Sequence, residues 1–284
     1  MPIPERTWSR TARRVVGSGL GPLAGSILVV LALVALAPQL FTRQDPYRIN
    51  ADLRLAPPTL SHPFGTDELG RDVFSRVLFG TRLSLGVAVL VVAASGLVGT
   101  GIGLAAGYGQ GRISELTMRL ADVCIAFPAL IMAMGITAFL GPGLANSMLA
   151  VMIIWWPQYA RLARGQVLAE RVKPYVEAAR ATGLSAPRIL WRHILPNSWV
   201  PLLIKATMDL GLALLLTASL SFLGLGARPP TPELGALVTQ GREHLLSAWW
   251  YSTFPGLVIF LAVFACNLLG DSLRDALDPT LGRD

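Results

Sequence analysis

Apolar residues dominate this chain in six long runs, which short polar stretches separate. A helix rises about 1.5 Å per residue and the hydrocarbon core of a bilayer is about 30 Å thick, so roughly 20 apolar residues span it. Each run reaches that length. The pattern therefore predicts an all-α polytopic membrane protein with six transmembrane helices. The runs lie at about residues 20–41, 83–107, 118–140, 144–163, 200–225 and 251–271.

Composition agrees with a membrane protein. Of 284 residues, 53% are hydrophobic and 14% charged, and the mean hydropathy is +0.55. A pI near 10.1 is also typical of nucleic-acid-binding proteins, but basic residues scattered between apolar runs report membrane orientation, and we expect no nucleic-acid partner. Cys124 and Cys266 both fall inside apolar runs and predict no disulfide.

The first run could also be a signal peptide, because Arg13 and Arg14 precede it and the sequence "ALA" at 35–37 resembles a cleavage site. The run is longer than the apolar part of a typical signal peptide, and Pro38 directly follows the cleavage position. We therefore expect a retained membrane anchor.

The distribution of basic residues predicts the orientation. With six spans, the segments on the side of the two termini hold 16 of the 24 Lys and Arg residues. Positive charge gathers on the cytoplasmic side, so both termini are expected in the cytoplasm of a multi-pass protein of the cytoplasmic (inner) membrane. The first outer connection, 42–82, carries six arginines, which nearby carboxylates partly offset.

The outer connections contain two further patterns. Thr66 can cap a helix whose first turn holds Asp67 and whose apolar face holds Val73 and Val77, which predicts an amphipathic helix in the interface rather than a substrate contact. The aromatic run 249–251 is placed as an interfacial belt would be.

No catalytic site is visible in the sequence. The three histidines are far apart, and no GxxxxGK[ST] loop is present, so we expect neither a metal nor a nucleotide in this chain. Charged residues near the spans fall into pairs at helical spacing, which predicts local pairing rather than a proton relay. The pairs are Arg119 with Asp122, Lys205 with Asp209, and Asp271 with Arg274.

The stretch 174–196 predicts two short helices joined by a fixed bend. Pro174 suits a first helical turn and Glu177 lies near its positive end. Gly183 can adopt the left-handed conformation that ends a helix, Ser185 can cap the next one, and Pro196 is expected to end it. The residue pattern alone leaves two roles open for this basic pair of helices: it could transmit force, or it could rest on lipid headgroups.

"EAARATG" followed by "ILPN" resembles the EAA signature of ABC-transporter permeases that work with a solute-binding protein. Three further blocks, "GTDELGRDVFSRVLFGTRLSL", "SFLGLGARPPTPELG" and "FPGLVIFLAVFACNLLGDSLRDALDP", resemble the C-type permease of dipeptide, oligopeptide and nickel importers. The resemblance covers residues 60–280. The residues that match the signature are Glu177, Ala178, Ala179, Gly183, Ile194, Leu195 and Pro196.

This resemblance implies the type I, MetI-like importer fold. Residues 1–60 would form the cytoplasmic N-terminus, the first span and the start of the outer loop, and residues 61–284 the permease domain. The coupling helix, within 174–196, would sit in a cleft of an ATPase subunit. The site residues implied are the seven of the signature, and our charge argument adds Arg180 and Arg188 as candidate charge partners.

The implied partners are a homologous second permease in a heterodimer, two ATPase subunits that bind ATP and Mg, an extracytoplasmic solute-binding protein and the lipid bilayer. The expected function is the import of dipeptides or oligopeptides, with catalysis confined to the ATPases. Nickel and glutathione-like solutes stay open as substrates. A stand-alone secondary transporter and a membrane-embedded enzyme are less favoured, because neither mid-membrane coupling residues nor a catalytic set is visible.

Overall fold

A computed structural model describes residues 21–109 and 111–277, and within these ranges the chain is helical with no β-strand. Residue 20, where the first predicted span begins, lies outside the described residues, and so do the two termini, which we expect in the cytoplasm. The helices are α2 (Gly21–Leu36), α3 (Val73–Tyr108), α4 (Arg112–Ala126), α5 (Ala129–Leu140), α6 (Leu144–Glu170), α7 (Pro174–Ala181), α8 (Ala186–Ile189), α9 (Leu195–Phe222), α10 (Leu234–Arg242) and α11 (Trp250–Leu277).

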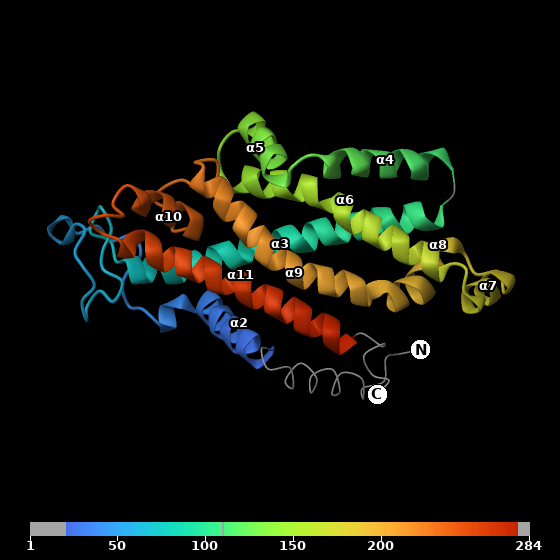
Figure 1. Cartoon of the computed structure of the whole chain (residues 1–284), viewed down its shortest axis with the longest axis horizontal. Helices are drawn as coiled ribbons and strands as arrows, with labels where there is room; N and C mark the ends of the chain where they lie inside the picture. The colour runs from blue at the N-terminus through green and yellow to red at the C-terminus, as the bar shows by residue number, and fades with distance from the viewer. Residues whose placement is uncertain (1–20, 110, 278–284) are drawn as a thin grey trace.

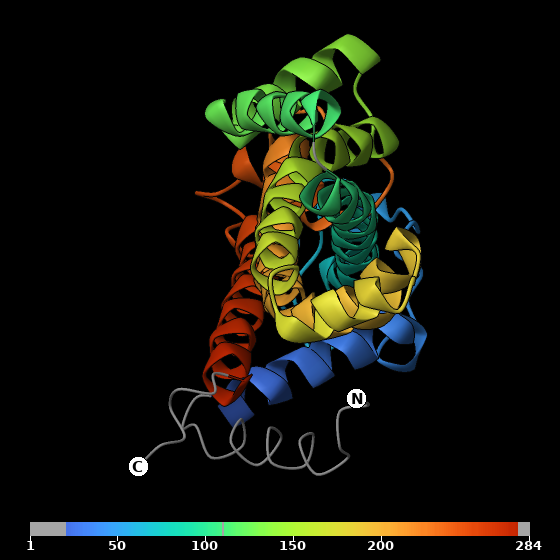
Figure 2. The same ribbon diagram turned by 90° about the vertical axis from the view of Figure 1, so that its right-hand side faces the viewer.

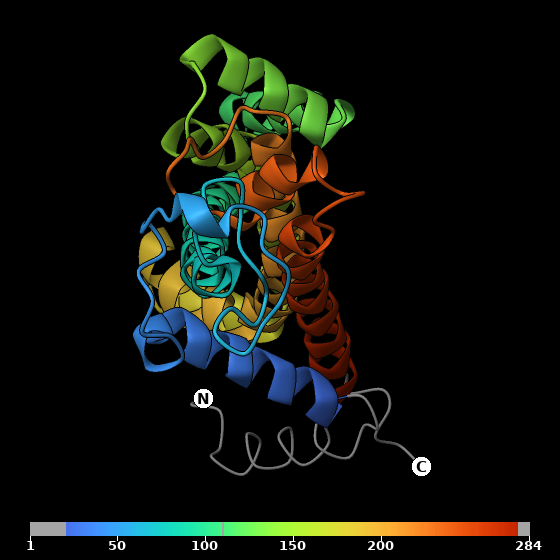
Figure 3. The same ribbon diagram turned by 90° about the vertical axis from the view of Figure 1, so that its left-hand side faces the viewer.

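The long helices α3, α6, α9 and α11 form an elongated bundle (Figure 1). Helix α2 lies on one flank, and α4 and α5 lie on the opposite flank, as the two end views show (Figures 2 and 3). We call the end that holds residues 37–72 and 223–249 the loop end, and the end that holds residues 171–194 the hairpin end. The two ends lie at opposite extremes of the bundle (Figure 1).

All six predicted spans coincide with helices, but the six-span count is only partly met. Within the described residues, three helices are long and apolar enough to cross a membrane: α3, the continuous helix Ala186–Phe222, and α11. The pair α4 and α5 would make a fourth if it counts as one span. Helix α2 is apolar but has 16 residues, and α6 has 27 residues but is too polar for the same criterion.

The predicted spanning helix over 118–140 is not continuous. Helices α4 and α5 meet at a bend of 98°. The bend falls at Phe127, whose backbone is extended, because the ring of Pro128 disfavours the helical conformation in the residue before it. This break leaves α4 on the flank of the bundle, alongside α6.

Close backbone contact joins α3 to α6. A Cβ atom at Gly99 would lie 2.3 Å from the carbonyl oxygen of Trp156, and one at Gly103 would lie 2.3 Å from that of Ala160. One turn further, a Cβ at Gly107 would lie 2.7 Å from the Cβ of Val167. Small residues at every fourth position let two membrane helices approach until their backbones touch.

Helices α6 and α9 are also tied to each other at the loop end. The backbone carbonyl of Leu225, just after α9, accepts hydrogen bonds from the Gly143 N–H and the Ser147 hydroxyl at the start of α6, both at 2.9 Å. Inside the bundle, Lys205 and Asp209 pair at 3.0 Å, as predicted.

The other two predicted charge pairs do not form. Arg119 pairs with Glu115 at 2.6 Å, one turn earlier on α4. Asp122 instead pairs with Arg161 of α6 at 3.1 Å, because α4 lies against α6. Asp271 and Arg274 form no ion pair with each other, and both are exposed near the end of α11.

A buried charge network holds the loop end together. Asp67 contacts Arg71 at 2.6 Å and Arg76 at 3.4 Å, and all three side chains are at most 4% exposed. Arg76 also donates to the carbonyl of Pro46 at 3.1 Å and to Gln240 of α10 at 3.5 Å. One arginine thereby joins the long loop, α3 and α10.

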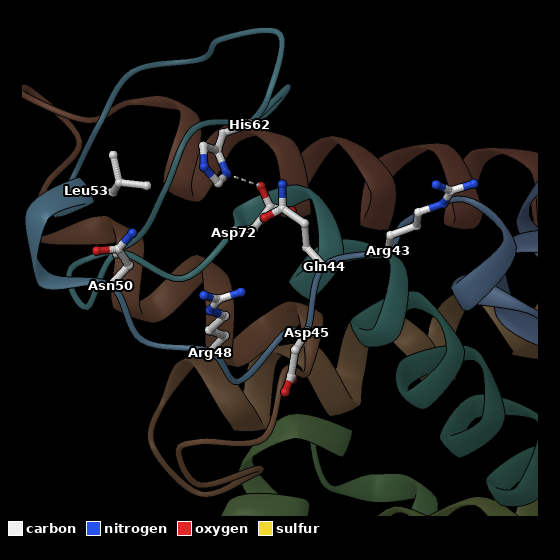
Figure 4. A pocket seen from close by; sticks show the side chains of 9 residues that line it. Arg43, Gln44, Asp45, Arg48, Asn50, Leu53, His62 and Asp72 are labelled. Carbon is white, nitrogen blue, oxygen red and sulfur yellow. Dashed lines mark hydrogen bonds and ion pairs between the residues drawn. The ribbon is translucent and has the colours of Figure 1, made fainter.

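The predicted helix start at Thr66 is wrong. Helix α3 begins at Val73, and its N-cap is Asp72, whose carboxylate accepts from the Ser75 N–H at 2.7 Å and contacts His62 at 2.9 Å (Figure 4). Thr66 and Asp67 instead lie in the preceding loop, where Thr66 accepts from the Ala56 N–H and Asp67 pairs with Arg71 of the loop and Arg76 of α3.

The predicted aromatic belt at 249–251 is also wrong for two of its members. Trp250 is 6% exposed and donates from Nε1 to the carbonyl of Thr66, and Tyr251 is fully buried with its hydroxyl 2.8 Å from Gln240. The long loop covers them, so they pack as core residues. Only Trp249, 50% exposed, stays on the surface.

We predict that Gly103→Leu weakens the α3–α6 contact, because the added side chain meets the backbone of Ala160. Overpacking of this kind costs about 1–3 kcal/mol of unfolding free energy. Thermal unfolding of the purified protein in detergent, followed by tryptophan fluorescence, should show a lower Tm. The control is Gly101→Leu, since a Cβ at Gly101 meets nothing within 4 Å. Equal melting temperatures for the two variants would contradict the contact.

Candidate functional site

The hairpin at 174–194 begins with α7, which forms as the sequence predicts. Pro174 occupies the first turn and Glu177 lies in that turn as its acidic residue. Helix α7 ends in a Schellman motif: the Gly183 N–H donates to the carbonyl of Arg180 at 2.9 Å, and the Leu184 N–H donates to that of Ala179 at 3.2 Å. Gly183 has φ +77°, which confirms the predicted left-handed bend.

An apolar cluster seats the hairpin on the ends of α3 and α6. Val176 and Ala179 of α7 pack with Leu104 of α3 and Val167 of α6, and Ile189 joins them from α8. Each of these side chains is at most 7% exposed. The hairpin is therefore packed against the bundle rather than extended away from it.

A polar clasp fixes α7 from its N-terminal side. Glu170, 7% exposed at the end of α6, accepts from Lys173 at 2.6 Å and from the Tyr175 hydroxyl at 2.5 Å. Asn197 of α9 lies 3.5 Å from the same hydroxyl. Burial and the neighbouring Glu170 carboxylate raise the pKa of Tyr175 to about 12, so the phenol stays a hydrogen-bond donor at neutral pH.

Two arginines attach the hairpin to the last turn of α3. Arg171 donates to the carbonyl of Gly107 at 3.2 Å. The Arg180 guanidinium lies 5.1 Å from the centre of the Tyr108 ring and donates to its hydroxyl at 3.3 Å. Arg180, predicted as a charge partner for an ATPase, is thus engaged within its own chain while its side chain stays exposed.

The second arm of the hairpin differs from the prediction. Ser185 is the N-cap of α8, although its side chain makes no capping hydrogen bond. The helix does not end at Pro196: α8 continues through a π-helical turn, Leu190–Ile194, into α9. The wide turn places Pro196 in the first turn of α9, where its missing N–H costs no hydrogen bond.

The nine predicted site residues divide into two groups. Six are exposed: Glu177, Ala178, Arg180, Gly183, Arg188 and Pro196. The other three face into this chain: Ala179 is 7% exposed, Ile194 is fully buried and Leu195 is half-buried. A partner could therefore touch the first group, whereas the second group seats the hairpin.

Sequence reasoning missed the residues of the clasp. Tyr175 and Asn197 are 22 residues apart and Glu170 belongs to the preceding helix, so no local pattern joins them. It also missed Trp191, which is 66% exposed in the π-helical turn beside the exposed group. Within the described residues, no group of three or more His, Cys, Asp or Glu side chains could hold a metal ion.

Comparison with known proteins identifies the family of this chain. The family described as "Binding-protein-dependent transport system inner membrane component" matches residues 99–283, which include the whole hairpin. The chain belongs to this family. It is therefore a multi-pass inner membrane component of a transport system that depends on a binding protein, and its long apolar helices agree with this.

Two relatives in this permease family are similar over almost the whole chain. The probable D,D-dipeptide transport system permease protein DdpC of Escherichia coli (strain K12) is 43% identical over 94% of this chain and 89% of its own. The glutathione transport system permease protein GsiD of Pectobacterium atrosepticum is 41% identical over 96% of this chain and 91% of its own.

A solved structure supports the predicted MetI-like permease fold. A chain of the inward-facing MetNI methionine ABC transporter superposes with a TM-score of 0.59 at 18% identity, over 72% of this chain and 97% of its own. At that identity, the likeness concerns the fold alone.

We predict that Tyr175→Phe loosens α7, because it removes the hydroxyl that joins Glu170 to Asn197. Hydrogen exchange of the backbone amides at 174–184 should become several-fold faster in the purified protein. The matched control is Tyr47→Phe at the loop end, whose hydroxyl has no hydrogen-bond partner among the described residues. Unchanged exchange in Tyr175→Phe would contradict the clasp.

Proposed function

We propose that this chain is a transmembrane permease subunit of an ABC importer that moves dipeptides or oligopeptides across the cytoplasmic membrane. The proposal is supported by the hairpin, which lies within the residues that match the transport-component family. It is packed rigidly on three helices and yet leaves Glu177, Ala178 and Arg188 exposed. The name of the Escherichia coli relative supports a peptide substrate.

The proposed assembly contains a homologous second permease, two ATPase subunits and an extracytoplasmic solute-binding protein. The ATPase subunits bind ATP and Mg, and the permease itself catalyses no reaction. The family's dependence on a binding protein supports the last partner. The exposed group of the hairpin offers a carboxylate, two guanidinium groups and a small Ala178 surface to an ATPase cleft.

The proposed orientation puts the hairpin end and both termini in the cytoplasm and the loop end outside. Support comes from charge: the hairpin end holds Arg171, Lys173, Arg180, Arg188 and Arg192, and positive residues gather on the cytoplasmic side. At the loop end, the Asp67 carboxylate pairs with two of the arginines, Arg71 and Arg76.

Coupling then follows from rigid-body motion. Closure of the ATPase dimer on ATP would displace the seated α7, and the clasp and the apolar cluster would pass that displacement to α3 and α6. Because α8 continues into α9 through the π-helical turn, the second arm passes the same displacement to α9. The pathway would thereby alternate between inward and outward access.

A direct test uses the complete complex in proteoliposomes with its binding protein. We expect uptake of labelled dipeptide that requires ATP and that excess unlabelled dipeptide abolishes. Stronger competition by glutathione or Ni²⁺ would favour these alternative substrates, of which glutathione has support from the Pectobacterium relative. Uptake without ATP would instead favour a stand-alone secondary transporter.

We predict that Gly183→Val abolishes most uptake in this assay while membrane insertion persists. A Cβ at Gly183 meets no other atom, so the effect comes from its φ of +77° alone. This conformation costs a side-chain-bearing residue about 1–2 kcal/mol, which lowers the population of the bent form roughly 5- to 30-fold. Gly183→Asn is the control, because Asn tolerates this conformation. Wild-type uptake by Gly183→Val would refute the role of the bend.

We predict that Glu177→Lys reduces the amount of ATPase that co-purifies with the permease, since the exposed carboxylate becomes a cation. The yield of ATPase per permease, measured on a stained gel, should fall several-fold. Asp52→Lys makes the same charge change on an exposed residue at the loop end and should have no effect. Equal yields for both variants would remove Glu177 from the contact surface.

A further inference from the structure

Arg82 is an unpaired cation at the edge of the membrane-spanning part of α3. It is the last charged residue before an uncharged stretch, 83–107, that is long enough to cross the hydrocarbon core. Its side chain is exposed and has no hydrogen bond or ion pair with any described residue. Arg71 and Arg76, earlier in the same region, are both buried and paired with Asp67.

A large apolar groove begins beside Arg82. It has a volume of about 690 Å³ and lies between α2 and α3, with Leu210 and Leu214 of α9 and Cys266 of α11 also lining it. Along α3, the groove runs from Arg82 to Ala93. At about 1.5 Å per residue this is roughly 16 Å, which matches half of a hydrocarbon core about 30 Å thick. With Arg82 at the membrane boundary, a groove of this length reaches roughly to the midplane.

A second apolar groove lies on the other side of Arg82. It has a volume of about 380 Å³, and Phe79, Leu144 and Met148 contribute to its lining. Arg82, Gly86 and Leu90 line both grooves. These three residues follow one another at every fourth position, so they form a single ridge along α3 that separates the two grooves.

The ridge is lowest at Gly86, because glycine has no side chain. A Cβ at Gly86 would meet no atom within 4 Å, so the two grooves are open to each other and to the surroundings at this point. A ligand with two apolar chains could lie across the ridge here, with one chain on each side.

We propose that Arg82 and the two grooves bind one phospholipid of the adjacent leaflet. The phosphate contacts the Arg82 guanidinium, which presents several N–H donors in a planar arrangement suited to phosphate oxygens. The acyl chains lie in the grooves on either side of Gly86. This site is independent of the proposed transport function.

Charge favours a phospholipid over a protein helix as the occupant. An apolar helix packed against α3 here would cover Arg82 and leave a cation without a partner in a region of low dielectric, which is strongly unfavourable. A phospholipid supplies an anion at the boundary and hydrocarbon below it. The ligand thus matches the site in charge, in length and in number of chains.

Native mass spectrometry of the full chain, purified with its partner subunits, tests the proposal. The complex is titrated with phosphatidylglycerol, and separately with diacylglycerol, which has the same chains but no phosphate. We expect phosphatidylglycerol to remain bound and diacylglycerol to be lost. Equal retention of the two would refute recognition of the phosphate by Arg82.

Two variants locate the site. Arg82→Gln and Gly86→Leu should each raise the phosphatidylglycerol concentration for half-occupancy at least fivefold. The controls are Arg54→Gln, an exposed arginine of the loop end, and Gly101→Leu, a glycine of α3 with open space around it. Both controls should bind as the wild type does. If Gly86→Leu fails to fold, the half-occupancy concentration of Arg82→Gln alone decides the outcome.

A third variant distinguishes lipid from protein. In Gly86→Cys, the introduced thiol should react with a phospholipid that carries a thiol-reactive group in its acyl chain. Cross-linking of this cysteine to a partner subunit instead would overturn the proposal. Wild-type lipid retention by both Arg82→Gln and Gly86→Leu would overturn it as well.

Discussion

The backbone contact between α3 and α6 is the constraint on which the rest of the structure depends. The two helices approach so closely at Gly99, Gly103 and Gly107 that a side chain would collide with α6: with a carbonyl oxygen at the first two positions and with the Val167 side chain at the third. This contact sets the position of the end of α3 relative to the end of α6. The hairpin needs both ends, because Leu104 and Val167 form its apolar seat and the Gly107 carbonyl accepts from Arg171.

The signature residues of the hairpin consequently have two different physical roles. Ala179, Ile194 and Leu195 face the bundle and hold the hairpin in place, whereas Glu177, Ala178 and Arg188 face outward. A short helix of eight residues is unstable by itself in water, so the seat is what gives α7 a defined position. For the proposed coupling role this seat matters, because a loosely attached helix would absorb a displacement instead of passing it on.

Local signals in the sequence predicted much of this arrangement. Each of the six apolar runs coincides with a helical region, and Pro174 and Gly183 marked the two ends of α7. Contacts between distant segments were not predictable in the same way. Trp250 and Tyr251 are buried because the loop of residues 42–72 folds over them, and the Tyr175 clasp joins three helices.

Three structural details have visible signals in the sequence that local patterns alone did not resolve. The glycines of α3 recur at every fourth position, a spacing typical of close membrane-helix contacts. Pro128 follows Phe127 in the middle of an apolar run, and there the backbone turns by 98°. Pro196 predicts a helix end, yet a π-helical turn accommodates it, since one extra residue per turn shifts the proline to a position that requires no N–H.

The hydrogen bonds at Leu225 and at Glu170 together make a closed frame of α6, the hairpin and α9. In the proposed transport cycle, α6, the hairpin and α9 would therefore move together, and the helices outside this frame, such as α2 and α11, would shift relative to it.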